Sequence, residues 1–334
     1  MICDTDALIL NNLQKGLPIV ERPFAEIAAC CQTSEAHIFE LMESLRAQGK
    51  LRRFGAVYDA RRIGFHSVLC AASIPEQDLV RFAAYACECD GVTHCYQRGI
   101  PGSGAPYPNL WFTLAAPAHE FDHELLRLKE LFAPHQIHAL PATRRFKIDV
   151  VFDMSTRQKD EMTEPATPMT EVSGKTDAPT FALTDEEWRI VRATQGDIPV
   201  QSEFFAPLAE TLGVPTELLI GKIADWKDKG IIRRIGAILR HNKIGFTANG
   251  MCCWNTDPEK CEAAGRALAR CPEVTHCYER PPLPGFPFRL YAMIHANTHD
   301  KAREIFSQLS ERAGLASGTI LFSLREFKKT SMKF

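Results

Sequence analysis

The residues best suited to chemistry stand in one short pattern that occurs twice. VTHCYQR at 92–98 and VTHCYER at 274–280 each place a histidine, a tyrosine and an arginine at alternate positions, and these residues are His94, Tyr96, Arg98, His276, Tyr278 and Arg280. Side chains alternate along a β-strand, so each triplet shares one face if its segment is a strand. Polar groups in a row on such a face need partners, and a ligand cavity provides them. We therefore predict two strands that face a ligand; a solvated face, or a histidine satisfied within the core, is the alternative.

These three residue types suit proton transfer beside a bound carboxylate. An imidazole donates or accepts a proton near neutral pH, and a phenol donates a hydrogen bond or relays a proton. A guanidinium binds a carboxylate through two parallel hydrogen bonds. We take His94, Tyr96, His276 and Tyr278 as candidate catalytic residues. A neutral imidazole also ligates iron, which makes His94 or His276 a candidate iron ligand.

Two arginine pairs add to the positive charge. RRFGA begins with Arg52 and Arg53, and RRIGA begins with Arg233 and Arg234. Together with the arginines of the triplets they make the candidate substrate-binding residues Arg52, Arg53, Arg98, Arg233, Arg234 and Arg280. So many guanidinium groups around a histidine and a tyrosine suit a small substrate with several carboxylates, and contact with DNA phosphates is the other use for the two pairs.

The pattern belongs to a repeat that covers the chain. GKLRRFGAVYDARRIGF at 49–65 aligns with GIIRRIGAILRHNKIGF at 230–246, an offset of 181 residues, and at the same offset Arg144, Phe146 and Lys147 match Arg325, Phe327 and Lys328. A constant offset over this span indicates two homologous halves. The segment 155–180 between them is rich in Thr, Pro, Glu and Lys and poor in large apolar residues. That composition predicts a flexible linker.

Apolar spacing and capping signals predict the elements that carry these residues. Helices are expected at 4–14, 23–31 and 33–49, and the segment after them is expected to form a two-stranded wing. A strand–helix–strand–strand–helix–strand order follows, and the second half repeats the arrangement. We therefore predict an α+β fold of two tandem units, each a winged helix-turn-helix plus a ferredoxin-like domain. The predicted boundaries are 1–64, 65–154, 155–180 for the linker, 181–245 and 246–334.

The third helix of each unit is poorly charged for contact with DNA. The first, at 34–48, carries Arg46 against Glu35, Glu40 and Glu43, and the second, at 216–229, has balanced charges. Acidic groups that face a phosphate backbone repel it. We therefore expect these helices to have a structural or dimerisation role, and we expect no DNA partner.

The totals favour a globular protein of the cytoplasm. The chain has 334 residues, of which 45% are hydrophobic, and a formal net charge of -2. We expect neither a signal peptide nor a membrane span, because no long apolar run is present. The cysteines, 12 in all, include no Cys-x-x-Cys spacing. We expect most of them to be buried, reduced thiols, with a metal or redox role as the alternative.

A helix-turn-helix followed by a small α+β domain resembles the Lrp/AsnC family. With the RRFGA and RRIGA segments and both VTHCY strands, the chain further resembles the siroheme decarboxylase family of the alternative haem and haem d1 pathways, with its two related subunits fused. The resemblance implies removal of CO₂ from two acetate side chains of siroheme, which gives 12,18-didecarboxysiroheme. It implies no cofactor beyond the iron-tetrapyrrole substrate, siroheme, with bound haem as a further ligand.

The resemblance also implies partners. The two halves are expected to pair as a pseudo-dimer, with a homo-oligomer or association with related pathway subunits as further assemblies. Two other functions stay open: an Lrp/AsnC-type transcription regulator, and a haem-binding regulatory protein without catalysis. The Pro/Gly-rich segments 99–109 and 281–289 differ between the halves. They predict shaped loops, with a lid as one use, and unequal roles for the halves.

Overall fold

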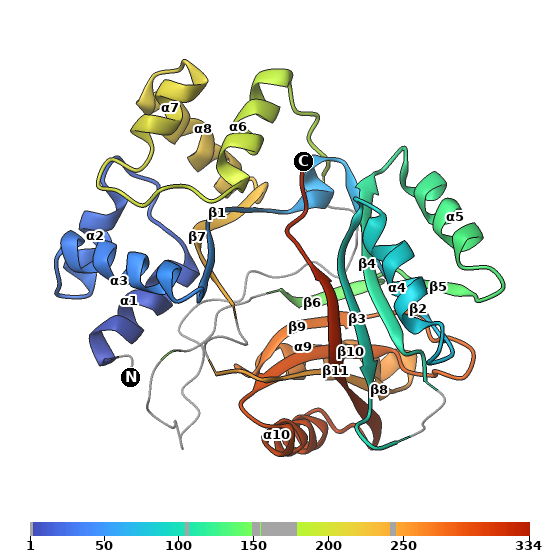
Figure 1. Ribbon diagram of the computed structural model, residues 1–334. Helices are drawn as coiled ribbons and strands as arrows, with labels where there is room; N and C mark the ends of the chain where they lie inside the picture. The colour runs from blue at the N-terminus through green and yellow to red at the C-terminus, as the bar shows by residue number, and fades with distance from the viewer. Residues whose placement is uncertain (1–2, 104–106, 149–153, 155–178, 241–244) are drawn as a thin grey trace.

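The protein is an α+β body built from two similar halves (Figure 1). The computed structural model describes residues 3–103, 107–148, 154, 179–240 and 245–334. Two clusters of helices lie on one side, a large sheet with its own helices lies on the other, and a pair of strands lies between them (Figure 1). The predicted α+β fold class is confirmed. The predicted linker, 155–180, falls almost entirely outside the described residues.

Each half opens with three helices, and the two sets share a core. They are α1 (Asp4–Lys15), α2 (Pro23–Cys30) and α3 (Glu35–Ala47), then α6 (Asp185–Gln195), α7 (Ala206–Leu212) and α8 (Thr216–Asp228). Ser34 caps α3 because its Oγ accepts a hydrogen bond from the His37 N–H at 3.2 Å. Phe24 packs edge-on against Phe204 of the other half, with ring centroids 5.8 Å apart. One cluster of buried side chains thus spans both helix sets, which pair as predicted.

The wing strands pair differently from the sequence prediction. Instead of folding back within its own half, β1 (Leu51–Tyr58) pairs antiparallel with β7 (Ile232–Leu239) of the other half. Gly55 lies opposite Gly236 in this pair, and a Cβ on either would collide with a carbonyl oxygen of the segment packed on it. Each half therefore contributes one strand to a shared wing, and a short 3-10 helix, η1 (Ala60–Ile63), leads from β1 toward the large sheet.

The large sheet also combines both halves. Among the described residues it has nine strands in the order β5-β2-β4-β3-β11-β8-β10-β9-β6. The strands are β2 (Phe65–Ala72), β3 (Val92–Gly99), β4 (Leu110–Pro117), β5 (Ile137–Leu140) and β6 (Arg144–Ile148), then β8 (Ala248–Asn255), β9 (Val274–Glu279), β10 (Leu290–Ala296) and β11 (Ser317–Lys329). The edge strands β5 and β6 are separated only by residues 141–143. The two edges therefore lie close together, and the sheet curls round an interior.

The last strand of each half crosses to the other half. β11 pairs with β8 through its first residues and with β3 through its last residues, whereas β6 pairs with β9. Phe146 of β6 is part of the second half's core cluster, and Phe327 of β11 packs against that of the first half. The halves cannot separate without breaking these ladders, so strand exchange fixes how they face each other.

Helices cover the outer face of the sheet. They are α4 (Leu79–Glu88) and α5 (Phe121–Leu131) over the first-half strands, and α9 (Pro258–Ala269) and α10 (His299–Arg312) over the second-half strands (Figure 1). The predicted strand–helix–strand–strand–helix–strand order is confirmed in the second half, whereas in the first half the last predicted strand is divided into β5 and β6. Most cysteines are buried in these layers and all are unpaired, as expected. No helix in the described part of the chain is both long enough and apolar enough to cross a bilayer.

Candidate active site

Both triplets face one cavity of about 620 Å³ between the β1–β7 pair and the inner face of the large sheet. From β3 and β9 it is lined by His94, Tyr96, Arg98, His276, Tyr278 and Arg280, the last of which directly follows β9. From β1 and β7 it is lined by Arg52, Arg53, Arg233 and Arg234. Every residue that the sequence nominated as a site residue therefore borders the same space. A cavity of this size suits a cofactor-sized ligand.

Strand alternation explains why the triplets reach the cavity. The cysteine between each histidine and tyrosine points the other way, into the core under the outer helices. His94 Nδ1 lies 3.0 Å from the Thr93 hydroxyl, and His276 Nδ1 lies 3.2 Å from the Thr275 hydroxyl. Each histidine ring is also nearly parallel to the tyrosine ring that follows it, with centroids 6.3 Å and 6.2 Å apart. The two histidines therefore have the same neighbours within their strands, a threonine hydroxyl and a tyrosine ring.

Both imidazoles are neutral at pH 7 without a ligand. Burial, followed by the charges of Arg52 and Lys329, lowers the pKa of His94 to about 3. Burial, followed by the charges of Arg233 and Arg280, lowers the pKa of His276 to about 4. A neutral imidazole ligates iron or accepts a proton. It becomes a proton donor only if negative charge enters the cavity and raises its pKa.

The triplet arginines are buried beneath the tyrosines. The Arg98 guanidinium carbon lies 5.1 Å from the Tyr96 ring centroid, and the Arg280 guanidinium carbon lies 4.8 Å from that of Tyr278. Arg98 donates to the Asn249 side chain at 3.2 Å, and Arg280 donates to a backbone carbonyl oxygen. The Arg280 Nε–H is buried and has no hydrogen-bond partner among the described residues. Buried guanidinium groups without a carboxylate partner are suited to an incoming anion.

The wing arginines point inward. Arg53 donates to the Ser331 hydroxyl at 3.2 Å and to the Ala56 carbonyl oxygen at 3.1 Å, and burial lowers its pKa to about 10. Arg46, the one arginine of α3, donates to both carboxylate oxygens of Asp197 at 2.9 Å and 3.0 Å. The arginines that the sequence left available for either DNA or a small anion therefore belong to the cavity.

The cavity has a large surplus of positive charge. Its cationic side chains are Arg52, Arg53, Arg61, Arg98, Arg145, Arg233, Arg234, Arg280 and Lys329, and Asp59 is the one carboxylate among the described lining residues. The sequence prediction missed Asp59, Arg145 and Lys329, and it named Arg61 only as a basic residue of the wing. The repeat alignment contained a signal, because Asp59 aligns with Arg240, a reversal of charge between the two halves. The strand exchange that brings Arg145 and Lys329 into the site had no comparable signal.

The described residues of the Pro/Gly-rich loops do not cover the cavity as a lid. No described residue of 99–109 or 281–289 lines it. Instead Tyr107, Phe286 and Phe288 pack with Trp111 in an aromatic cluster between the two halves, where the rings of Phe286 and Phe288 are 4.7 Å apart. Four residues that follow β11 border the cavity instead: Thr330, Ser331, Met332 and Phe334. The loops differ in sequence but both serve the interior packing.

Family models match both halves in the same order. A model described as "Siroheme decarboxylase NirDL-like HTH domain" matches residues 6–52 and 187–233, and one described as "AsnC-like ligand binding domain" matches 62–147 and 243–328. A siroheme decarboxylase from Hydrogenobacter thermophilus is 32% identical over 328 residues, covering 98% of this chain and 93% of the relative. The chain belongs to the siroheme decarboxylase family. The predicted resemblance is therefore confirmed.

Other members of the siroheme decarboxylase family agree with a fused architecture. The NirDL subunit of Paracoccus pantotrophus is 32% identical, covering 98% of this chain and 96% of that one. The beta subunit from Methanosarcina barkeri is 37% identical over 145 residues, covering 43% of this chain and 95% of its own length. A crystal structure of the siroheme decarboxylase NirDL in co-complex with an iron-uroporphyrin III analogue superposes with a TM-score of 0.71 at 28% identity, covering 99% of this chain and 94% of that one.

Proposed function

We propose that this protein is a siroheme decarboxylase, a carboxy-lyase that removes CO₂ from two acetate side chains of siroheme to give 12,18-didecarboxysiroheme. The observation that carries the proposal is the cavity itself, in which two His-Tyr-Arg triplets face a space rich in guanidinium groups. A tetrapyrrole with several carboxylates is the ligand class that such a surplus of cations recognises best.

The reaction needs a fixed carboxylate and a proton. When the bond between the acetate methylene and its carboxylate breaks, CO₂ leaves and the electron pair stays on the methylene carbon, where the conjugated ring delocalises it. A proton then adds to that carbon to form a methyl group. The arginines hold the substrate's other carboxylates, which fixes the position of the reacting one. His94, Tyr96, His276 and Tyr278 are the proton donors beside it.

Binding prepares the histidines for this role. In the empty cavity the pKa values of about 3 for His94 and about 4 for His276 leave both imidazoles neutral. Substrate carboxylates offset the arginine charges and raise these pKa values toward neutrality, so an imidazole gains a proton as the substrate enters. Burial raises the pKa of Tyr96 and of Tyr278, which keeps both phenols protonated and able to relay that proton.

The metal in this proposal belongs to the substrate. His94 or His276, as a neutral imidazole, is the candidate ligand for the iron of siroheme, which would orient the tetrapyrrole plane in the cavity. Haem, which has the same iron and a similar plane, is a further ligand, and no other cofactor is proposed. We propose a cytoplasmic enzyme of haem or haem d1 biosynthesis, in which the paired halves associate further with copies of this chain or with related pathway subunits.

Anaerobic incubation of the purified protein with siroheme tests the proposal. We expect release of CO₂ and a product lighter by two carboxyl groups, measured by gas detection and mass spectrometry. Spectral evidence of binding without CO₂ would favour the haem-binding regulator. Tight, salt-sensitive binding to a defined DNA duplex without turnover would favour the transcription regulator.

A further inference from the structure

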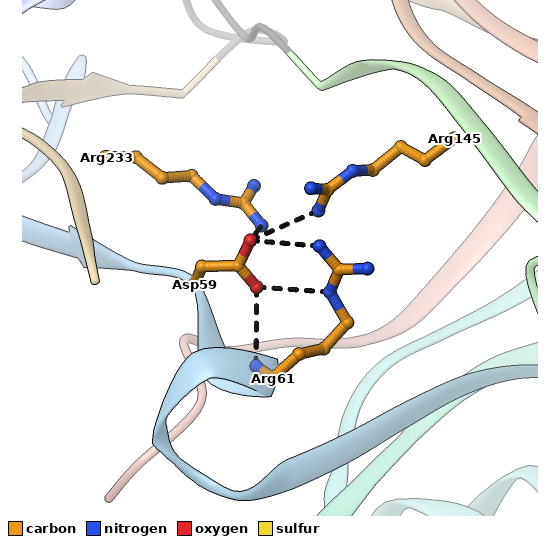
Figure 2. A network of polar contacts seen from close by, with 4 residues as sticks. All are labelled: Asp59, Arg61, Arg145 and Arg233. Carbon is orange, nitrogen blue, oxygen red and sulfur yellow. Dashed lines mark hydrogen bonds and ion pairs between the residues drawn. The ribbon is translucent and has the colours of Figure 1, made fainter. Parts of the chain in front are cut away.

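Asp59 forms ion pairs with three arginines beside the second triplet (Figure 2). Its Oδ2 accepts from Arg61 at 3.1 Å, from Arg145 at 3.2 Å and from Arg233 at 3.2 Å. Its Oδ1 accepts from Arg61 Nε at 3.2 Å. The Asp59 side chain is 6% exposed, whereas the three arginine side chains are 21–30% exposed toward the cavity. The carboxylate is thus the buried centre of a group whose cationic rim faces the ligand space.

The group joins elements that are far apart in the chain. Asp59 and Arg61 stand at the start of η1, Arg233 comes from β7 of the other half, and Arg145 comes from the exchanged strand β6. Burial on its own would raise the pKa of Asp59, but the hydrogen bonds and charges of the arginines hold it well below its usual range. The carboxylate is therefore ionised, and the group as a whole carries a surplus of positive charge.

Beside the first triplet the described residues are arranged differently. Glu326 and Arg240 lie with Arg52 and Lys329 round a small separate pocket, and neither Glu326 nor Arg240 lines the cavity. The internal repeat places Arg240 where the other side has Asp59, and Glu326 where it has Arg145. The ladders confirm the second correspondence, because Arg145 pairs with Tyr278 across β6 and β9, and Glu326 pairs with Tyr96 across β11 and β3. Residues paired in this way share a face of the sheet. The cross-strand neighbour of Tyr278 is therefore a cation, whereas the cross-strand neighbour of Tyr96 is an anion.

Donors remain on the cationic rim for a ligand. Arg145 Nε–H is buried and has no hydrogen-bond partner among the described residues. Arg145 contacts Asp59 through its Nη1 group, and Arg233 contacts Asp59 through its Nη2 group. Arg233 also lies close enough to His276 for its charge to act on that imidazole. A carboxylate held on this rim would lie next to the second triplet.

We infer that Asp59 is a positioning residue that gathers Arg61, Arg145 and Arg233 into a carboxylate subsite at one end of the cavity only. The two ends are then unlike, and a tetrapyrrole binds in one orientation. This inference rests on the proposed function and adds to it. It assigns a fixed order to the loss of the two acetates, since a single orientation presents one of them first.

The test uses two matched variants at equivalent positions of the repeat. Arg145→Gln removes a charge from the proposed subsite, and Glu326→Gln removes the opposite charge at the other end. Affinity is measured by absorption titration with iron-uroporphyrin III, which needs no turnover. We expect Arg145→Gln to weaken binding by about tenfold or more, the usual effect of losing a hydrogen bond to a charged group. Glu326→Gln is expected not to weaken it, and equal losses in both variants would overturn the inference.

A second measurement addresses orientation. Asp59→Asn keeps the size of the side chain and an Oδ1 acceptor for the Arg61 N–H, but it removes the charge that gathers the arginines. In a quenched single turnover with siroheme, the wild type is expected to give one monodecarboxylated intermediate and Asp59→Asn a mixture of both. One intermediate from both proteins would overturn the inference. If Asp59→Asn does not fold, Arg145→Gln takes its place in this assay. A wild type that releases no CO₂ would instead contradict the proposed function.

Discussion

Stability against pH gives a direct test of the cavity's electrostatics. The perturbation is the double variant His94→Gln/His276→Gln, which replaces both imidazoles with side chains that do not titrate. In the folded, ligand-free protein the pKa of His94 is about 3 and that of His276 is about 4, against an ordinary value of 6.5. As pH falls below 6.5, the unfolded chain binds protons that the folded chain does not, so folding becomes less favourable.

The magnitude follows from these values. At about pH 5 each unfolded imidazole is almost fully protonated while its folded counterpart is not, which costs at most about 2 kcal/mol per histidine. Both rings border a water-accessible cavity, and solvent screening reduces this cost. We therefore expect about 2 kcal/mol for the pair. The loss begins near pH 6.5, increases as pH falls and levels off below the folded pKa values.

The assay is urea unfolding of the wild type and the double variant at about pH 7.5 and about pH 5. The wild type should lose more stability between the two conditions, by the amount above. His119→Gln/His123→Gln is a matched control, because both side chains are 79% exposed, and it should lose as much as the wild type. An equal loss in the wild type and the cavity variant would refute the claim that the arginines and burial keep these imidazoles neutral.

Three further outcomes are expected. Arg52→Ala or Arg233→Ala should weaken binding of an iron tetrapyrrole by about 1.5–3 kcal/mol in a spectroscopic titration, and unchanged affinity in both would remove these residues from the ligand site. Gly55→Ala should destabilise the fold by about 1–3 kcal/mol in thermal unfolding, because its Cβ would collide with the Gly196 carbonyl oxygen, whereas Gly221→Ala, with no atom close to the new Cβ, should not destabilise it. In gel-shift assays at physiological salt the protein should bind no specific DNA duplex, and nanomolar binding to a defined operator would contradict the inward placement of the wing arginines.

The sequence was sufficient to predict that the His-Tyr-Arg triplets face a cavity, because strand alternation is a local property. A two-residue spacing puts His94, Tyr96 and Arg98 on one face whatever the rest of the fold does. The pairing of the halves was expected from the resemblance to a family with two related subunits, and the buried cluster that spans both helix sets agrees with it. Whether these residues perform the chemistry is a prediction that the cavity supports and activity measurements must test.

The sequence did not predict which strands pair across the two halves. The same residues could form a wing hairpin within one half or a wing shared between the halves. In the shared form Gly55 and Gly236 lie opposite each other and pack closely against neighbouring backbone, and this contact is not visible in the local sequence. The exchange of β6 and β11 is equally non-local, so the placement of Arg145 and Lys329 could not be predicted. Proline and glycine in 281–289 predicted an irregular loop, but the buried Phe286 and Phe288 attach it to the interior.

The most direct test of the central claim is the single-turnover rate of CO₂ release from anaerobic siroheme by His94→Ala, His276→Ala and the double variant. Cavity-facing positions tolerate truncation, so all three should fold, which thermal unfolding checks. We expect the double variant, and at least one single variant, to be slower than the wild type by about 10²–10⁴, the usual contribution of general acid–base catalysis. His119→Ala, at an exposed position, should match the wild type. Wild-type rates in both single variants and in the double variant would contradict the claim that the repeated His-Tyr-Arg strands carry out the chemistry.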